Sequence, residues 1–189
     1  MTTCNRTRTP AFLATLVLAA VIYSPAPAHA SDGKVLPATV CQVWVPSNAT
    51  AAEVTELRNS ARYSVNGRVE NFHPSKTLTV VCPLIHDTIN APLHWVRVSF
   101  RDKYAGNGYN NTGVLKCRIR SNDRFGEFEH DDFYRDSDEG DNDLDAQGDF
   151  EFLGLDTVEQ DGNYTLTCVI PPFSAGGASS IGSIAVEEP

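Results

Sequence analysis

The chain has 189 residues, 24 of them acidic and 15 basic, which gives a formal net charge of −9. Because phosphates and anionic lipids repel so acidic a chain, and no basic stripe is visible, nucleic acid and charged membrane surfaces are poor candidates as partners. The 159 residues that follow position 30 suffice for one domain with a sizeable core.

The first 30 residues have the three parts of a cleavable secretory signal peptide. Arg6 and Arg8 precede the apolar run 11–23, and Ala28-His29-Ala30 supplies small residues at the cleavage position. The apolar run has 13 residues, whereas a spanning helix needs about 20. We therefore predict that 1–30 is removed and that 31–189 forms a single domain, secreted or periplasmic, without a membrane span. A retained membrane anchor is the alternative.

Short segments rich in Val, Ile, Thr and aromatic residues, separated by Gly, Asn and Pro turns, predict eight or nine β-strands. An Asn66-Gly67 turn predicts a hairpin between the second and third of them. The final segment contains Gly182 and Ser183 and is expected to be an edge strand. In chain order the segments are 40–45, 63–65, 68–70, 77–84, 93–100, 113–119, 150–155, 163–170 and 181–186.

The segment 48–61 differs from the strand pattern. Thr50 followed by Glu53 has the spacing of a helix capping box, and Val54, Leu57 and Ala61 recur at helical spacing. The segment predicts a short helix, with a long loop as the alternative.

Residues 31–189 contain four cysteines, and the fifth, Cys4, lies in the predicted signal peptide. An even number of cysteines in an exported domain indicates disulfides. Three pairings are possible, and Cys41–Cys82 with Cys117–Cys168 is favoured because partners that are nearer in sequence are easier to close. Each bridge would contribute about 4 kcal/mol in the chain-entropy account. A zinc site with four cysteine ligands is the alternative, but no two cysteines have metal-ligand spacing.

These features predict an all-β fold: a two-sheet β-sandwich, immunoglobulin-like or jelly-roll-like, with two disulfides and one long acidic loop. A closed barrel is the alternative. The stretch Asp161-Gly162-Asn163-Tyr164 before Cys168 resembles the tyrosine-corner region of immunoglobulin domains, although the tyrosine lies four residues before the cysteine instead of two. The resemblance implies an immunoglobulin-like layout and no particular family.

The acidity is concentrated in the predicted loop 129–149, which has ten acidic residues and a single basic one, Arg135. Calcium takes six to eight oxygen ligands, and alternating aspartates can supply them. The segment departs from a regular EF-hand, because Ala146 and Phe152 stand where that motif needs Gly and Glu. The hypothesis is an EF-hand-like or other Asp-rich calcium loop between strands; the alternative is a solvated acidic loop. Its candidate ligands are Asp136, Asp138, Asp141, Asp143, Asp145 and Asp149.

A second candidate site is the Gly/Asn/Tyr-rich loop 104–112. Its aromatic and amide side chains suit sugar stacking and sugar hydroxyls, although Gly and Asn also suit turns. The candidate ligand-binding residues are Tyr104, Asn107, Tyr109 and Asn110. No nucleophile elbow, zinc-protease or phosphate-binding motif occurs.

The sequence therefore predicts a secreted, non-enzymatic β-sandwich module with an interaction or structural role. Its ligand would be calcium, a glycan or a protein surface. One alternative is a secreted hydrolase that uses a carboxylate pair or a His–Asp pair in a concave pocket. Another is a subunit of an extracellular assembly that pairs through the strand 181–186.

Overall fold

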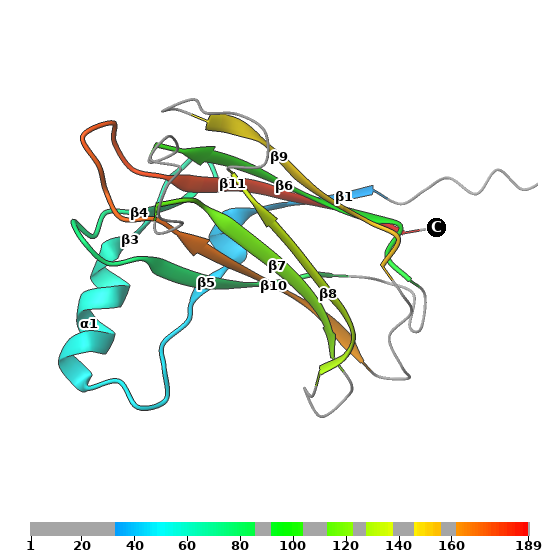
Figure 1. The fold of residues 1–189 in the computed structure, drawn as a ribbon, viewed down its shortest axis with the longest axis horizontal. Helices are drawn as coiled ribbons and strands as arrows, with labels where there is room; N and C mark the ends of the chain where they lie inside the picture. The colour runs from blue at the N-terminus through cyan, green and yellow to red at the C-terminus, as the bar shows by residue number, and fades with distance from the viewer. Residues whose placement is uncertain are drawn as a thin grey trace, which may run out of the picture.

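The computed structural model describes residues 33–85, 92–103, 113–122, 128–137, 146–155 and 162–188. In these stretches the chain forms two antiparallel sheets that face each other, with the helix α1 (Ala51–Ser60) at one end (Figure 1). The predicted signal peptide 1–30 lies outside the described residues. Among those residues, no helix is long and apolar enough to cross a membrane.

The first layer, sheet A, has the strand order β3-β4-β11-β6-β9, and β1 also pairs with β11. Its strands are β1 (Gly33–Pro37), β3 (Ala61–Tyr63), β4 (Val69–Asn71), β6 (Trp95–Asp102), β9 (Ala146–Leu153) and β11 (Ser180–Glu187). A turn of 3-10 helix, η1 (Ala38–Val40), leads from β1 to the second layer.

The second layer, sheet B, has the order β2-β5-β10-β7-β8. Its strands are β2 (Gln42–Val43), β5 (Leu78–Pro83), β7 (Lys116–Asn122), β8 (Phe128–Asp136) and β10 (Asn163–Ile170). The predicted fold class, an all-β two-sheet sandwich with two disulfides, is confirmed.

The core lies between the sheets because apolar side chains alternate along each strand. In β5, Leu78, Val80 and Cys82 are fully buried while the residues between them are half-buried. Val96 and Val98 of β6 are buried opposite them in sheet A. Full burial of one such aliphatic side chain stabilises the fold by about 1.5–3 kcal/mol, so the period-two pattern is sufficient to bring the two sheets together.

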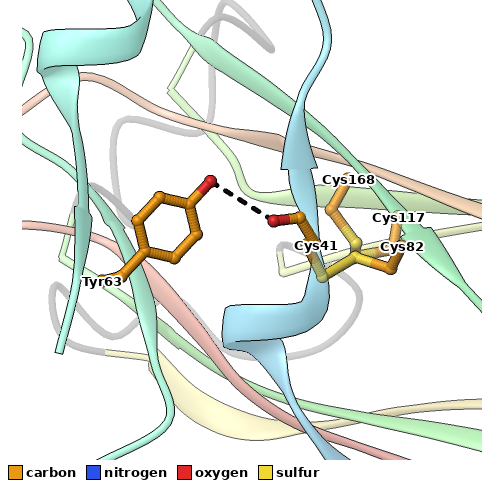
Figure 2. The surroundings of a disulfide bond; sticks show 5 residues. All are labelled: Cys41, Tyr63, Cys82, Cys117 and Cys168. Atoms are coloured by element: carbon orange, nitrogen blue, oxygen red, sulfur yellow. Dashed lines mark hydrogen bonds between the residues drawn. A yellow bond between two sulfur atoms is a disulfide. The ribbon is translucent and has the colours of Figure 1, made fainter. Parts of the chain in front are cut away.

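The two disulfides have the favoured pairing (Figure 2): one links the residue directly before β2 to β5, and the other links the neighbouring strands β7 and β10. Cys41 bonds Cys82 and Cys117 bonds Cys168, with sequence separations of 41 and 51. The immunoglobulin disulfide instead joins the two sheets, so this fold departs from that pattern. The Tyr63 hydroxyl donates a hydrogen bond to the Cys41 carbonyl oxygen at 3.3 Å, which ties the edge of sheet A to the first bridge.

The short helix predicted within 48–61 is confirmed as α1. The Thr50 hydroxyl accepts a hydrogen bond from the Glu53 backbone N–H at 3.3 Å, and the Glu53 carboxylate accepts one from the Thr50 N–H at 2.8 Å. This reciprocal pair is the predicted capping box, and it satisfies two donors that a helix start otherwise leaves unpaired.

The predicted hairpin is also present, but its turn has three residues instead of two. The Gly67 N–H donates to the Ser64 carbonyl, and the Ser64 N–H donates to the Arg68 carbonyl, which leaves 65–67 as the loop. Gly67 has a φ of +80°. A type I turn followed by a left-handed glycine is the usual geometry of a three-residue hairpin loop.

The prediction that 181–186 forms an edge strand is wrong. β11 lies inside sheet A, where it pairs with β6 on one side and with β1 and β4 on the other. Ile181, Ile184 and Val186 are buried, so the segment carries core residues. The register shifts between Ile181 and Ile184, and Gly182 and Ser183 fill this bulge instead of marking a sheet edge.

The acidic segment 129–149 is not one continuous loop. Its first part belongs to β8 and its last part to β9, which are edge strands of sheet B and sheet A. Charged side chains are common on edge strands because they discourage pairing with other chains. The Arg135 guanidinium donates to the Glu151 carbonyl oxygen at 3.2 Å and so joins the two edges.

A buried polar cluster fixes the end of the sandwich where β6 ends. Asp102 is completely buried and accepts hydrogen bonds from the Ser179 hydroxyl at 2.9 Å and from the Leu115 N–H at 2.7 Å. The Ser137 hydroxyl also donates to Asp102, at 2.5 Å. Leu115 precedes β7 and Ser137 follows β8, so this carboxyl group connects sheet A to two strands of sheet B.

Candidate ligand-binding face

The face of sheet B that is turned away from sheet A is hollowed and mostly polar. Alternation within β5, β7 and β10 turns one set of half-buried side chains toward this face. The set is Thr79, Val81, Lys116, Arg118, Arg120, Asn122, Thr165, Thr167 and Val169. We call this surface, together with Trp44 beside it, the sheet B groove.

Trp44 is the main exposed aromatic residue of the groove. β2 ends at Val43, whose side chain packs against the core, and the next residue therefore faces outward. The Trp44 N–H donates to the Thr79 carbonyl at 2.9 Å, which fixes its backbone against β5. Its side chain remains 51% exposed.

Two hollows meet at Trp44 and Thr79, both of which line each of them. The first has a volume of about 660 Å³ and extends toward α1, and the second has about 640 Å³ and extends toward the far end of β10. The first is lined also by Pro46, Leu57, Ser75, Lys76, Thr77, Val114, Lys116, Val169 and Pro172. The second is lined also by Val81, Arg120, Asn122, Asn163, Thr165 and Thr167.

Amide and hydroxyl groups at the floor of the second hollow are held by one another. The Asn122 side-chain amide donates to the Thr165 hydroxyl at 2.7 Å and to the side-chain Oδ1 of Asn163 at 3.3 Å. The Thr165 hydroxyl in turn donates to the same Asn163 oxygen at 3.3 Å. Mutual hydrogen bonds fix the direction of polar groups, and such groups recognise a ligand at low entropic cost.

Tyr134 of β8 lies across the strand pair from Arg118 and is 42% exposed. The Lys116 ammonium lies 5.9 Å from the centre of its ring. Burial raises the pKa of the Tyr134 hydroxyl, and the hydrogen bond and positive charge of Lys116 partly oppose that rise. Tyr134 thus adds a second aromatic side chain at the opposite edge of the face from Trp44.

At the other end, α1 is joined to the groove wall by a histidine and a lysine. His73 is buried, and its Nδ1 accepts hydrogen bonds from the backbone N–H groups of Ser75 and Lys76. Its Nε2 therefore carries a proton and donates to the Glu56 carboxylate at 2.9 Å. The hydrogen bond from His73 and the one from the Lys76 ammonium lower the pKa of Glu56. Both ring nitrogens of His73 therefore form hydrogen bonds within the protein.

The predicted loop site and most of the predicted calcium ligands fall outside the described residues. These are Tyr104, Asn107, Tyr109 and Asn110, and Asp138, Asp141, Asp143 and Asp145. The remaining two aspartates belong to different sheets: Asp136 pairs with Lys116 in sheet B, and Asp149 pairs with Ser99 in sheet A. Both stand on outward faces, so the structure does not bring these two together. No group of three metal-ligating side chains occurs in the described part of the chain.

The sequence did contain signals for the groove. Trp44 stands between Val43 and Val45 in an alternating segment, so one large aromatic side chain falls on the polar face. The stretch Lys116-Cys117-Arg118 likewise alternates a core residue with cations. What the sequence could not supply was the position of β7 at the middle of an open face, because strand order depends on contacts distant in sequence.

No family model matches the chain, and no curated protein matches it. Among solved structures it is similar to a family two carbohydrate esterase from Cellvibrio japonicus, with 10% identity and a TM-score of 0.41 over 84% of this chain. The chain spans only 34% of that esterase. A low-affinity xylan-binding module from Roseburia intestinalis has 10% identity and a TM-score of 0.43, covering 84% of this chain and 96% of the module. A domain of a multidomain xylanase from the hindgut metagenome of Trinervitermes trinervoides has 10% identity and a TM-score of 0.37, covering 82% and 96%. These values describe a distant likeness.

Proposed function

We propose that this chain is an extracellular carbohydrate-binding module and that the sheet B groove is its ligand-binding surface. The observation that carries the proposal is the position of Trp44, half-exposed at the junction of two hollows. A large aromatic side chain that stays accessible in a concave surface is the usual centre of a binding site.

The chemistry of the groove suits a sugar. A pyranose ring has an apolar C–H face, which can stack on an indole, and a rim of hydroxyl groups, which need donors and acceptors. Asn122, Asn163 and Thr165 provide amide and hydroxyl groups in fixed directions beside Trp44. The two hollows together exceed the space of one sugar unit, which favours a chain of sugars over a monosaccharide.

The same lining supports binding over hydrolysis. A carbohydrate-cleaving site needs a carboxylate pair that flanks the bond to be broken. Neither hollow is lined by an aspartate, glutamate or histidine among the described residues. The two disulfides suit an oxidising, extracellular environment.

The test is retardation of the purified domain in gels cast with soluble polysaccharides, comparing Trp44→Ala with Trp95→Ala. Trp95 is the matched control because it is the other tryptophan of the chain and lies on the outward face of sheet A, with the Arg97 guanidinium 4.8 Å from its ring centre. We expect Trp44→Ala to abolish the retardation and Trp95→Ala to preserve it. Equal retardation of both variants would refute the assignment of the groove.

A further inference from the structure

The sheet B groove is basic although the protein as a whole is acidic. Its two hollows are lined by Lys76, Lys116 and Arg120 and, among the described residues, by no acidic side chain. The complete chain, by comparison, has 24 acidic residues and 15 basic ones. The sign of the charge in the groove is thus opposite to that of the protein.

The cations form a row along the central strand β7. Lys116, Arg118 and Arg120 occupy alternate positions and share the outward face, between β10 on one side and β8 on the other. Alternate residues of a strand are about 7 Å apart. Lys116 lines the first hollow and Arg120 the second, and Arg118 stands between them on the strand, so an extended polymer would pass over several positive charges.

Acidic side chains nearby balance part of this charge. Lys76 forms an ion pair with Glu56 of α1, while Lys116 and Arg120 lie opposite Asp136 and Asp132 of β8. Arg118 lies opposite Tyr134 instead. Each guanidinium has five N–H donors, so an arginine that already has a protein partner can still bind an anionic group.

Acidic residues reduce the positive charge of the row only where they lie close to it. Charges separated by more than about 8–10 Å are largely screened at physiological ionic strength. Asp132 and Asp136 of β8 pair with members of the row and lie within this distance. The described last part of the acidic segment belongs to β9, in the other sheet. The β7 row and these two aspartates therefore determine the charge that a bound ligand meets.

We infer that the ligand is an anionic polysaccharide, whose carboxylate or sulfate groups bind the β7 row while a sugar ring stacks on Trp44. This inference rests on the proposed function and specifies its ligand class. Arginine suits both groups because its planar fork can donate two parallel hydrogen bonds to one anion.

The test uses two pairs of polymers that differ only in charge, measured by isothermal titration calorimetry. Polygalacturonate is compared with its methyl-esterified form, and dextran sulfate with dextran, so that the pairs separate carboxylate from sulfate recognition. We expect one anionic polymer to bind at least about tenfold more tightly than its neutral partner, since a charge-assisted hydrogen bond is worth that much. Increasing NaCl should weaken the anionic complex and leave neutral binding unchanged.

Substitutions in the β7 row test whether these cations cause the preference for anionic polymers. Arg118→Gln with Arg120→Gln should remove the preference, while the matched charge change Arg68→Gln, at an exposed position in the β3–β4 turn, should retain it. If the double glutamine variant does not fold, the preference for the anionic polymer is measured instead in Arg118→Lys with Arg120→Lys. The salt series on the unaltered protein is the second measurement. The lysine variant should keep a reduced preference.

Equal affinity for charged and neutral members of each pair would overturn the inference but leave the proposed function intact. A preference that survives in the double glutamine variant would also overturn it. If no polymer in a broad panel binds, the proposed function itself fails.

Discussion

Replacing Asp102 by alanine should remove a large part of the stability of this protein. The carboxyl group is completely buried and accepts hydrogen bonds from the Leu115 N–H and from the hydroxyls of Ser137 and Ser179. A buried donor that loses its acceptor costs about 1–3 kcal/mol. The Leu115 N–H would keep one acceptor, Ser137 Oγ at 3.1 Å, so we expect a total loss of about 3–5 kcal/mol.

That loss is large because small domains are stable by only about 5–15 kcal/mol. The assay is equilibrium unfolding in urea with the disulfides intact, and the midpoint should fall with little change in slope. The thermal midpoint should fall by about 6–20 °C, at about 2–4 °C for each kcal/mol. Asp149→Ala, at an exposed position on sheet A and measured in EDTA, is the control and should change stability by less than about 0.5 kcal/mol. A loss below about 1 kcal/mol for Asp102→Ala would refute the view that this cluster holds the two sheets together.

Three further predictions concern α1 and the acidic segment. Thr50→Ala removes the capping box and should destabilise the protein by about 1 kcal/mol in urea unfolding; an unchanged midpoint would show that α1 does not contribute to the cooperative unit. The pKa of Glu56 is lowered from 4.5, so its contribution to stability is present above that pH and is lost as the pH falls through the folded-state pKa. The stability difference between the wild type and Glu56→Gln should therefore shrink between pH 5 and pH 3, and a constant difference would argue against the His73 and Lys76 contacts. Millimolar calcium should raise the thermal midpoint relative to EDTA, with magnesium as the control, and changing Asp141, Asp143 and Asp145 together to Asn should remove the rise; no rise would favour a solvated acidic segment.

Local patterns predicted the local structure well. The alternation in 163–170 predicted a buried apolar face that includes Leu166 and Cys168, and the structure buries both. The capping box at Thr50 and the preference for disulfides between nearer cysteines were also correct. Each of these features depends on residues close in sequence or on simple strand periodicity.

The features that failed or were missed depend on strand order. Whether β11 is central or at an edge depends on β1, β4 and β6, which precede it by long stretches of sequence. The exposure of Trp44 likewise depends on the end of β2 at Val43 and on its hydrogen bond to Thr79. The net charge of the sequence did not predict the basic row on β7, because net charge does not record which face of a sheet a side chain occupies.

The most direct test of the account is tryptophan fluorescence in Trp95→Phe, a variant in which Trp44 is the only tryptophan of the sequence. Titration with the polysaccharide panel should give a saturable change in Trp44 emission, together with protection from acrylamide quenching, because the ligand covers a side chain that is 51% exposed when free. Binding measured in parallel by calorimetry, with no change in Trp44 emission or quenching, would place the ligand elsewhere and contradict the assignment of the sheet B groove.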